Sequence, residues 1–173
     1  MADPRLAVAA IVADAQRAQV YAAEIAAFDG TDLERVIDVD RVIRLIEQVI
    51  ASDWWPNVAV EVRAARVDAQ SSSTRCGSDP ASGSTIFLAR SQATVATAAH
   101  ELAHALAGVR NGHGRLYRRA FLDVVQVITN IDRVDARGML HVAQLSDAFG
   151  AAGLTVGERE WSAPPSVGGA IAL

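Results

Sequence analysis

Residues 85–108 read TIFLARSQATVATAAHELAHALAG, and this stretch combines the pattern of a strand with that of a helix. The first five residues, Thr85–Ala89, favour a short strand by their composition. Ser91 is the expected N-cap of a helix from Gln92 to Ala107, which Gly108 ends. The helix has one apolar stripe at helical spacing, formed by Val95, Ala98 or Ala99, Leu102 and Leu106.

Helices are expected on both sides of this stretch. Residues 5–27 are rich in alanine and free of glycine and proline, and Asp29 and Gly30 end that helix. Thr31–Glu34 has the form of a capping box that opens a second helical segment, continuing to Ser52 with a break near residues 38–40. Further helices are predicted over residues 116–129 and 139–149.

A second strand is predicted over residues 58–63, where apolar side chains alternate with others. The serine-rich residues 70–84 predict a mobile surface loop between this strand and Thr85–Ala89. The predicted fold class is therefore α+β, with a small antiparallel sheet packed on helices. We expect a single domain over residues 1–162 and a flexible tail over 163–173, where paired prolines and glycines occur.

Composition excludes several classes of protein. The chain has 173 residues, 51% of them hydrophobic, and no apolar stretch long enough for a membrane helix. Its net charge of −4 makes nucleic acid an improbable partner, and its single cysteine allows no disulfide framework within the chain. A cytoplasmic location is expected rather than secretion, because the apolar N-terminal run continues smoothly into the first helix.

The helix over residues 92–107 contains His100-Glu101-Leu102-Ala103-His104, an HExxH motif. Histidines four positions apart lie on one helix face, so both imidazoles can bind one metal ion. Glu101 follows the first histidine and can accept a proton from a water molecule on that ion. His100 and His104 are therefore predicted metal ligands, and Glu101 is the predicted general base.

Catalytic zinc usually has three protein ligands, and His113 is the best third candidate. Gly112 and Gly114 flank it and permit a tight reversal of the chain toward the helix. Glu158 and Glu160, the only glutamates after Glu101, are poor candidates because their region has no clear structural pattern. The metzincin pattern is excluded because it requires glycine and histidine where this chain has Ala107 and Arg110.

Other polar residues near the motif have two open interpretations each. Tyr117 is a candidate hydrogen-bond donor to an oxyanion, although packing behind His113 is the favoured interpretation. His141 is favoured as a structural or surface residue. The less favoured alternatives are an oxyanion donor and a substitute ligand. Asp123 is either a solvated helix residue or an outer carboxylate that holds a ligand histidine.

Three segments of the chain resemble the SprT-like group of zinc metallopeptidases, and more closely the small actinobacterial HExxH metallopeptidases. These segments are Thr85–Ala89, His100–His104 and His113–Tyr117, and the region around Arg17–Tyr21 and Glu24 is similar to the N-terminal helix of the actinobacterial group. The spacer before His113 is eight residues, shorter than is usual in SprT-like proteins, and Arg115 stands where they often have proline. The resemblance implies a minimal zincin-like domain with bound Zn²⁺ and a peptide or protein substrate.

The resemblance also implies a role for the predicted strand before the motif. An extended peptide can add to the edge of a sheet through its backbone, so Thr85, Ile86, Phe87 and Leu88 are the expected substrate-binding residues. The leading hypothesis is a zinc-dependent metallopeptidase. The alternatives are a catalytically silent zinc-binding regulatory or interaction protein, and a helical interaction module in which the motif is incidental.

Overall fold

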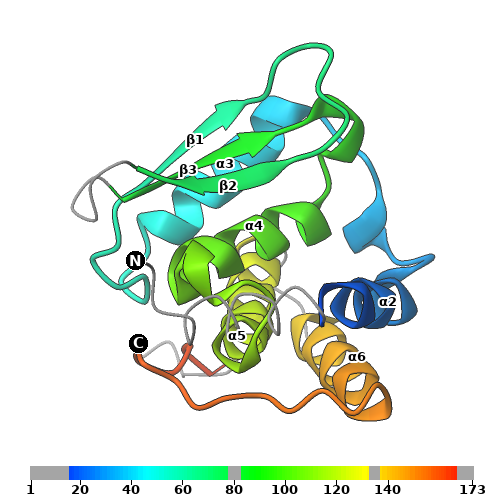
Figure 1. Ribbon diagram of the computed structural model, residues 1–173. Helices are drawn as coiled ribbons and strands as arrows, with labels where there is room; N and C mark the ends of the chain where they lie inside the picture. Colours follow the sequence, from blue (N-terminus) through cyan, green and yellow to red (C-terminus); the bar gives the residue numbers. More distant parts are fainter. Residues whose placement is uncertain (1–15, 78–82, 133–136, 167–173) are drawn as a thin grey trace, which may run out of the picture.

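The computed structural model describes residues 16–77, 83–132 and 137–166 (Figure 1). The described residues form an α+β domain in which a small sheet and α3 lie above α4, and α2, α5 and α6 lie below it (Figure 1). The predicted fold class is confirmed. The elements in chain order are α2 (Arg17–Phe28), α3 (Val39–Ile50), β1 (Val60–Ala64), β2 (Ser73–Cys76), β3 (Ser84–Leu88), α4 (Val95–Ala107), α5 (Arg115–Asp132) and α6 (Arg137–Ala151), with single 3-10 turns at Asp32–Glu34, Arg90–Gln92 and Val109–Asn111.

The sheet is mixed, so the prediction of an antiparallel sheet was wrong. Its strand order is β1-β3-β2; β1 runs parallel to β3, and β2 runs antiparallel to it. The sequence analysis missed β2 because Ser73–Cys76 has polar residues and no apolar alternation, and its strand form depends on backbone pairing with β3. Residues 78–82 of the expected loop lie outside the described residues.

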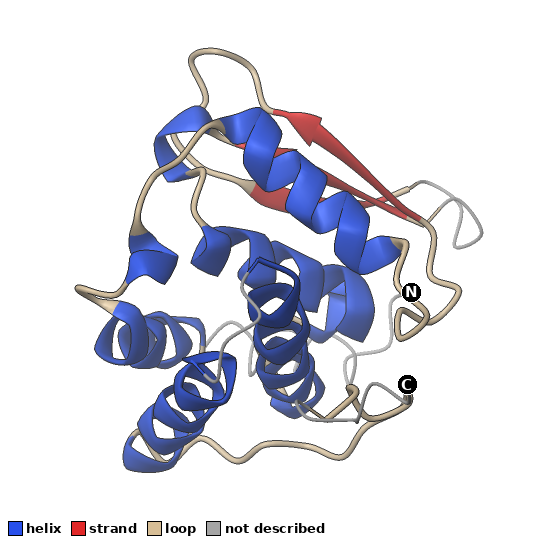
Figure 2. Ribbon diagram, turned by 180° about the vertical axis from the view of Figure 1, so that it is seen from behind, coloured by secondary structure: helices blue, strands red, loops and turns tan. Residues whose placement is uncertain are grey.

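One face of the sheet packs on helices. Ile86 and Leu88 of β3 are fully buried, whereas Thr85 and Phe87, which alternate with them along the strand, are partly exposed. This alternation follows from the two-residue period of a strand. Figure 2 shows α3 lying across the sheet, and α4 contacts β2 and β3. The sheet and α3 therefore fix the position of α4 from one side.

The helix starts differ from those expected. Thr31 does not cap a helix; its hydroxyl donates to the carbonyl oxygen of Phe28, and α3 begins after Asp38, whose side chain accepts from the backbone N–H of Arg41. The N-cap of α4 is Thr94 rather than Ser91, because Arg90–Gln92 forms a separate 3-10 turn. The expected ends of α2 and α4, before Asp29 and at Gly108, are confirmed. Residues 5–15 of the first expected helix are not among the described residues.

The chain after α6 returns along α5. Asp123 is buried and accepts hydrogen bonds from Arg159, at 2.6 and 3.0 Å, and from the indole of Trp161, at 3.0 Å. It is therefore not the outer carboxylate of a ligand histidine. Pro164 is also buried, and the carbonyl oxygen of Pro165 accepts from Gln126. Residues 167–173 of the expected tail lie outside the described residues.

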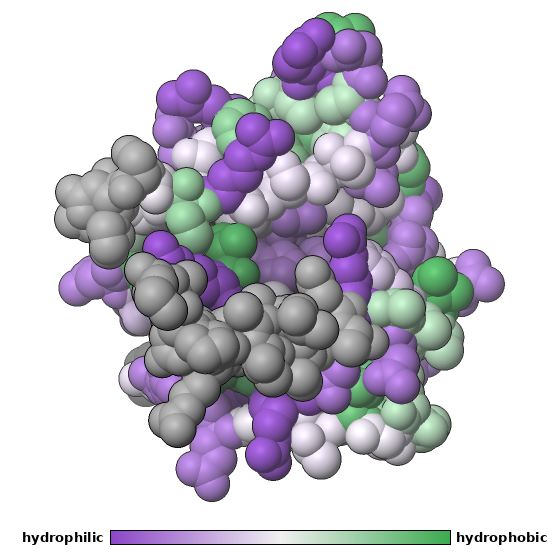
Figure 3. All heavy atoms as spheres, viewed as in Figure 1, coloured by the Kyte–Doolittle hydropathy of each residue, from purple (hydrophilic) through white to green (hydrophobic). Residues whose placement is uncertain are grey.

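Buried apolar side chains form a hydrophobic core that includes Trp54, Trp55, Phe28 and Phe121. On the face shown in Figure 3, apolar side chains outside the grey atoms lie in small groups separated by hydrophilic ones. None of the helices in the described part of the chain is long and apolar enough to cross a bilayer.

Candidate metal centre

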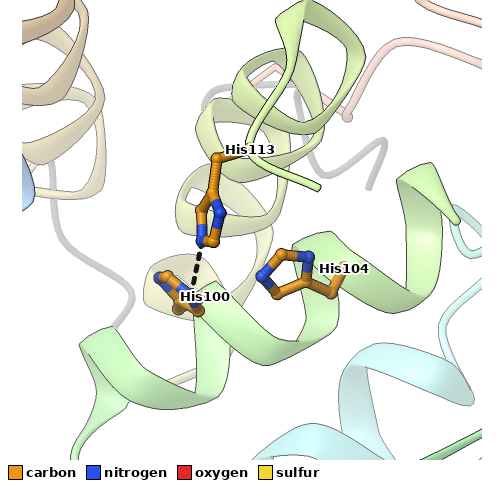
Figure 4. Close-up of side chains that lie close together, drawn as sticks. All are labelled: His100, His104 and His113. Carbon is orange, nitrogen blue, oxygen red and sulfur yellow. Dashed lines mark hydrogen bonds between the residues drawn. The ribbon is translucent and has the colours of Figure 1, made fainter. Parts of the chain in front are cut away.

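Helix α4 supplies two of the three histidines of the centre. His100 and His104 are one turn apart, on the face of α4 that is directed toward His113 and the start of α5 (Figure 4). The helix is held by Thr94 at its start and is buried along most of its length, with Ala96, Ala98 and Leu102 fully covered. The core therefore fixes the position of α4 and of the helix face that carries the two imidazoles.

His113 comes from the turn between α4 and α5. Gly108 and Gly112 have φ values of 85° and 50°, conformations that glycine adopts at little cost, and they turn the chain back over α4. Arg118 holds this turn, because its Nη1 donates to the carbonyl oxygen of His113 at 2.7 Å and its Nε donates to that of Thr155 at 2.8 Å. The predicted reversal at Gly112 is confirmed.

The three imidazoles converge. The ligand atoms of His100, His104 and His113 all lie within 4.8 Å of one another, and the Nε2 atoms of His100 and His113 are 3.4 Å apart (Figure 4). His100 and His113 are buried, and His104 is partly buried. The cluster can hold a metal ion.

Burial favours the neutral, ligand form of two of these histidines. It lowers the pKa of His104 to about 2 and that of His113 to about 4, and the positive charge of a protonated His100 acts in the same direction. Burial also lowers the pKa of His100, but the hydrogen bond and negative charge of Glu24 outweigh it and raise that pKa. Glu24 therefore makes His100 the most basic of the three imidazoles.

Glu24 is the residue that holds His100 from α2. Its Oε2 lies 3.0 Å from Nδ1 of His100, and both side chains are buried. This bond directs the other ring nitrogen, Nε2, toward His113. A carboxylate behind a ligand histidine fixes its tautomer and increases its basicity. No role was predicted for Glu24, although an acidic residue at helical spacing from the apolar Val20, Ala23 and Ala27 was a usable signal.

Glu101 lies next to the first ligand and is also buried, with 6% of its surface exposed. Its carboxylate oxygen Oε2 accepts a hydrogen bond of 2.7 Å from the hydroxyl of Thr74 on β2. Burial raises the pKa of Glu101, while the charge of His100 and the Thr74 hydrogen bond oppose that shift. Thr74 is a second residue of the site that the sequence analysis missed.

Two aromatic side chains enclose the histidines. Tyr117 is fully buried, and its ring centroid lies 4.4 Å from that of His104 and 4.8 Å from that of His113. Tyr21, which is 37% exposed, stacks on His100 at 5.2 Å and forms the outer rim. Tyr117 thus has the packing role considered for it, and its predicted catalytic role stays a prediction.

The site fits a metal ion with a bound water molecule. Within the described residues, Nδ1 of His104 and the hydroxyl of Tyr117 are buried with no hydrogen-bond partner. An unpaired buried polar group costs about 1–3 kcal/mol, and both of these groups belong to the cluster or pack against it. Three imidazoles with a nearby carboxylate are also the donor set of catalytic zinc.

The expected substrate strand requires a correction. Thr85–Leu88 belongs to β3, which is the central strand and pairs with β1 on one edge and β2 on the other. The backbone of β3 therefore has no edge for a further strand. The edge strand that contacts α4 is β2.

His141 lies apart from the histidine cluster. On α6, its Nδ1 lies 3.2 Å from Oε1 of Gln144, and its ring packs against Phe28. This placement agrees with the structural role favoured for it.

No known protein family, curated protein or solved structure is significantly similar to this chain. The resemblance to SprT-like metallopeptidases therefore rests on the three short segments alone.

The contact between Glu24 and His100 gives a testable expectation. Glu24→Gln keeps the size of the side chain but removes its charge, so we expect Zn²⁺ affinity to fall about 10–100-fold, the usual effect of losing such a partner. Competition with a chromophoric chelator measures the dissociation constant. Glu47→Gln, on the exposed face of α3, is the matched control. Equal affinities in the two variants would contradict the role of Glu24.

Proposed function

We propose that this protein is a zinc-dependent hydrolase that cleaves peptide bonds, with His100, His104 and His113 as the zinc ligands. The observation that carries the proposal is the convergence of three imidazoles beside an anchored carboxylate, with ligand atoms within 4.8 Å of one another. The motif resemblance to SprT-like metallopeptidases supports the peptide substrate, and we propose membership of that zincin group.

Zinc in such a site supplies Lewis acidity and a bound water molecule of lowered pKa. Glu101 is the general base. Because Thr74 holds Oε2 of Glu101, the other carboxylate oxygen, Oε1, takes the proton from the water and later gives it to the leaving amine. Glu24, by accepting from Nδ1–H of His100, would leave Nε2 as the atom that binds the ion.

The substrate backbone adds to β2 in this proposal. Ser73–Cys76 lies at the edge of the sheet, and Thr74 connects this strand to Glu101. A peptide in extended form can pair with such an edge through main-chain hydrogen bonds. Tyr117, whose buried hydroxyl has no partner among the described residues, is the proposed donor to an oxyanion formed beside the histidines.

Removal of the metal tests this function. The purified protein should contain one zinc per chain and should release fluorescent peptides from fluorescein-labelled casein. Dialysis against a chelator should reduce the release to background, because no water is then activated, and added Zn²⁺ should restore it. The same chelator saturated with zinc is the control for effects on the casein.

The other outcomes separate the alternatives. Stoichiometric zinc without hydrolysis of casein or of a peptide library would favour a silent zinc-binding regulatory or interaction protein. A purified chain that binds no zinc would contradict both and leave an interaction module.

A further inference from the structure

Thr74 connects the edge strand to the carboxylate beside the metal ligands. Its side chain is partly buried between β2 and α4. The hydroxyl lies 2.7 Å from Oε2 of Glu101 and 3.0 Å from the carbonyl oxygen of the same residue. One donor therefore contacts both the side chain and the backbone of Glu101.

This geometry restricts Glu101. A glutamate side chain has several rotatable bonds, and holding it in one conformation costs conformational entropy. A hydroxyl that contacts its backbone and its carboxylate together selects the conformations that bring these two groups near each other. A general base depends on such orientation, because a small displacement from the attacking water slows proton transfer.

We propose that Thr74 is a positioning residue that orients the Glu101 carboxylate toward the water-binding side of the histidine cluster. The proposal rests on the function proposed above. Because Thr74 belongs to the edge strand, a peptide that pairs with β2 contacts the same strand that holds the base. Substrate binding and base orientation are thereby coupled through one side chain.

The test compares Thr74→Val, which has nearly the same shape but no hydroxyl, with Thr74→Ser, which keeps the hydroxyl. With fluorescein-labelled casein, Thr74→Val should lower kcat about 10–100-fold, the equivalent of one hydrogen bond to a charged group. KM and Zn²⁺ affinity should stay within about twofold, since neither the backbone of β2 nor the histidines change. Thr74→Ser should recover most of kcat.

Thr129→Val is the matched control. Thr129 is buried on α5, where its hydroxyl donates to the carbonyl oxygen of Val125 at 2.6 Å, and it lies three turns beyond Tyr117. Its variant should keep the kcat of the original protein. Equal losses in Thr74→Val and Thr129→Val, no recovery in Thr74→Ser, or a change in KM alone would overturn the proposal.

A second measurement does not depend on hydrolysis. Urea unfolding of Thr74→Val, Glu101→Ala and the double variant forms a cycle that detects coupling between the two side chains. We expect the midpoint shift of Thr74→Val to shrink in the Glu101→Ala background, because the carboxylate acceptor is already absent. Additive shifts would overturn the positioning role. Absence of hydrolysis in the original protein, together with a non-additive cycle, would reject the proposed function and leave Thr74 as the residue that holds Glu101.

Discussion

His113→Ala is expected to lower Zn²⁺ affinity by about 100-fold or more, which exceeds the usual effect of losing an outer partner of a ligand. The variant leaves the two imidazoles on α4 and removes the third ligand, which comes from the turn between α4 and α5. It also removes a histidine whose pKa, lowered by burial to about 4, keeps it neutral and ready to bind the ion. Chelator competition followed by metal analysis of the dialysed protein measures the loss.

His141→Ala is the control for this variant. His141 is equally buried, with 7% of its surface exposed, but it lies on α6 beside Gln144. Its replacement should leave zinc binding unchanged, and circular dichroism should show both variants folded. Full zinc occupancy in folded His113→Ala would show that the third ligand has been assigned wrongly.

Glu101→Gln is expected to lower kcat about 10²–10⁴-fold, the usual contribution of a general base, while zinc remains bound. The amide keeps the size of the side chain and still accepts the Thr74 hydrogen bond, but it cannot take a proton from water. Hydrolysis of fluorescein-labelled casein and the zinc content of the same sample are measured together. Glu47→Gln, on the exposed surface of α3, should keep both.

Two results would contradict this role of Glu101. Loss of zinc in Glu101→Gln would make the carboxylate a ligand or a structural support of the site. Full hydrolysis with zinc retained would mean that another group activates the water, and Tyr117→Phe would then be the next variant to measure.

The parts of the site that are close together in the chain could be predicted from the sequence. His100 and His104 share a helix face because they are four residues apart, and the helix period alone requires this. The turn that returns His113 could also be predicted, since Gly112 allows a backbone conformation that other residues rarely adopt. The same local rules located α2, α4, α5, α6 and the two strands with apolar residues.

The groups that complete the site from distant parts of the chain could not be predicted, because the fold brings them together. Glu24 is 76 residues before His100, and Thr74 is 27 residues before Glu101. No periodicity connects such pairs. They meet because α2 packs on α6 with Glu24 against His100 of α4, and because β2 pairs with β3. Asp123 shows the same limit, since its partner is Arg159, 36 residues later, rather than a histidine.

The sheet shows most clearly why the sequence was not sufficient. Composition predicted β1 and β3, but parallel or antiparallel pairing depends on where the connecting chain runs, and that is a property of the whole fold. The polar strand β2 has no apolar pattern, and its backbone hydrogen bonds to β3 define it. Because β2 occupies one edge of β3 and β1 the other, tertiary pairing determined which strand has a free edge beside the metal centre.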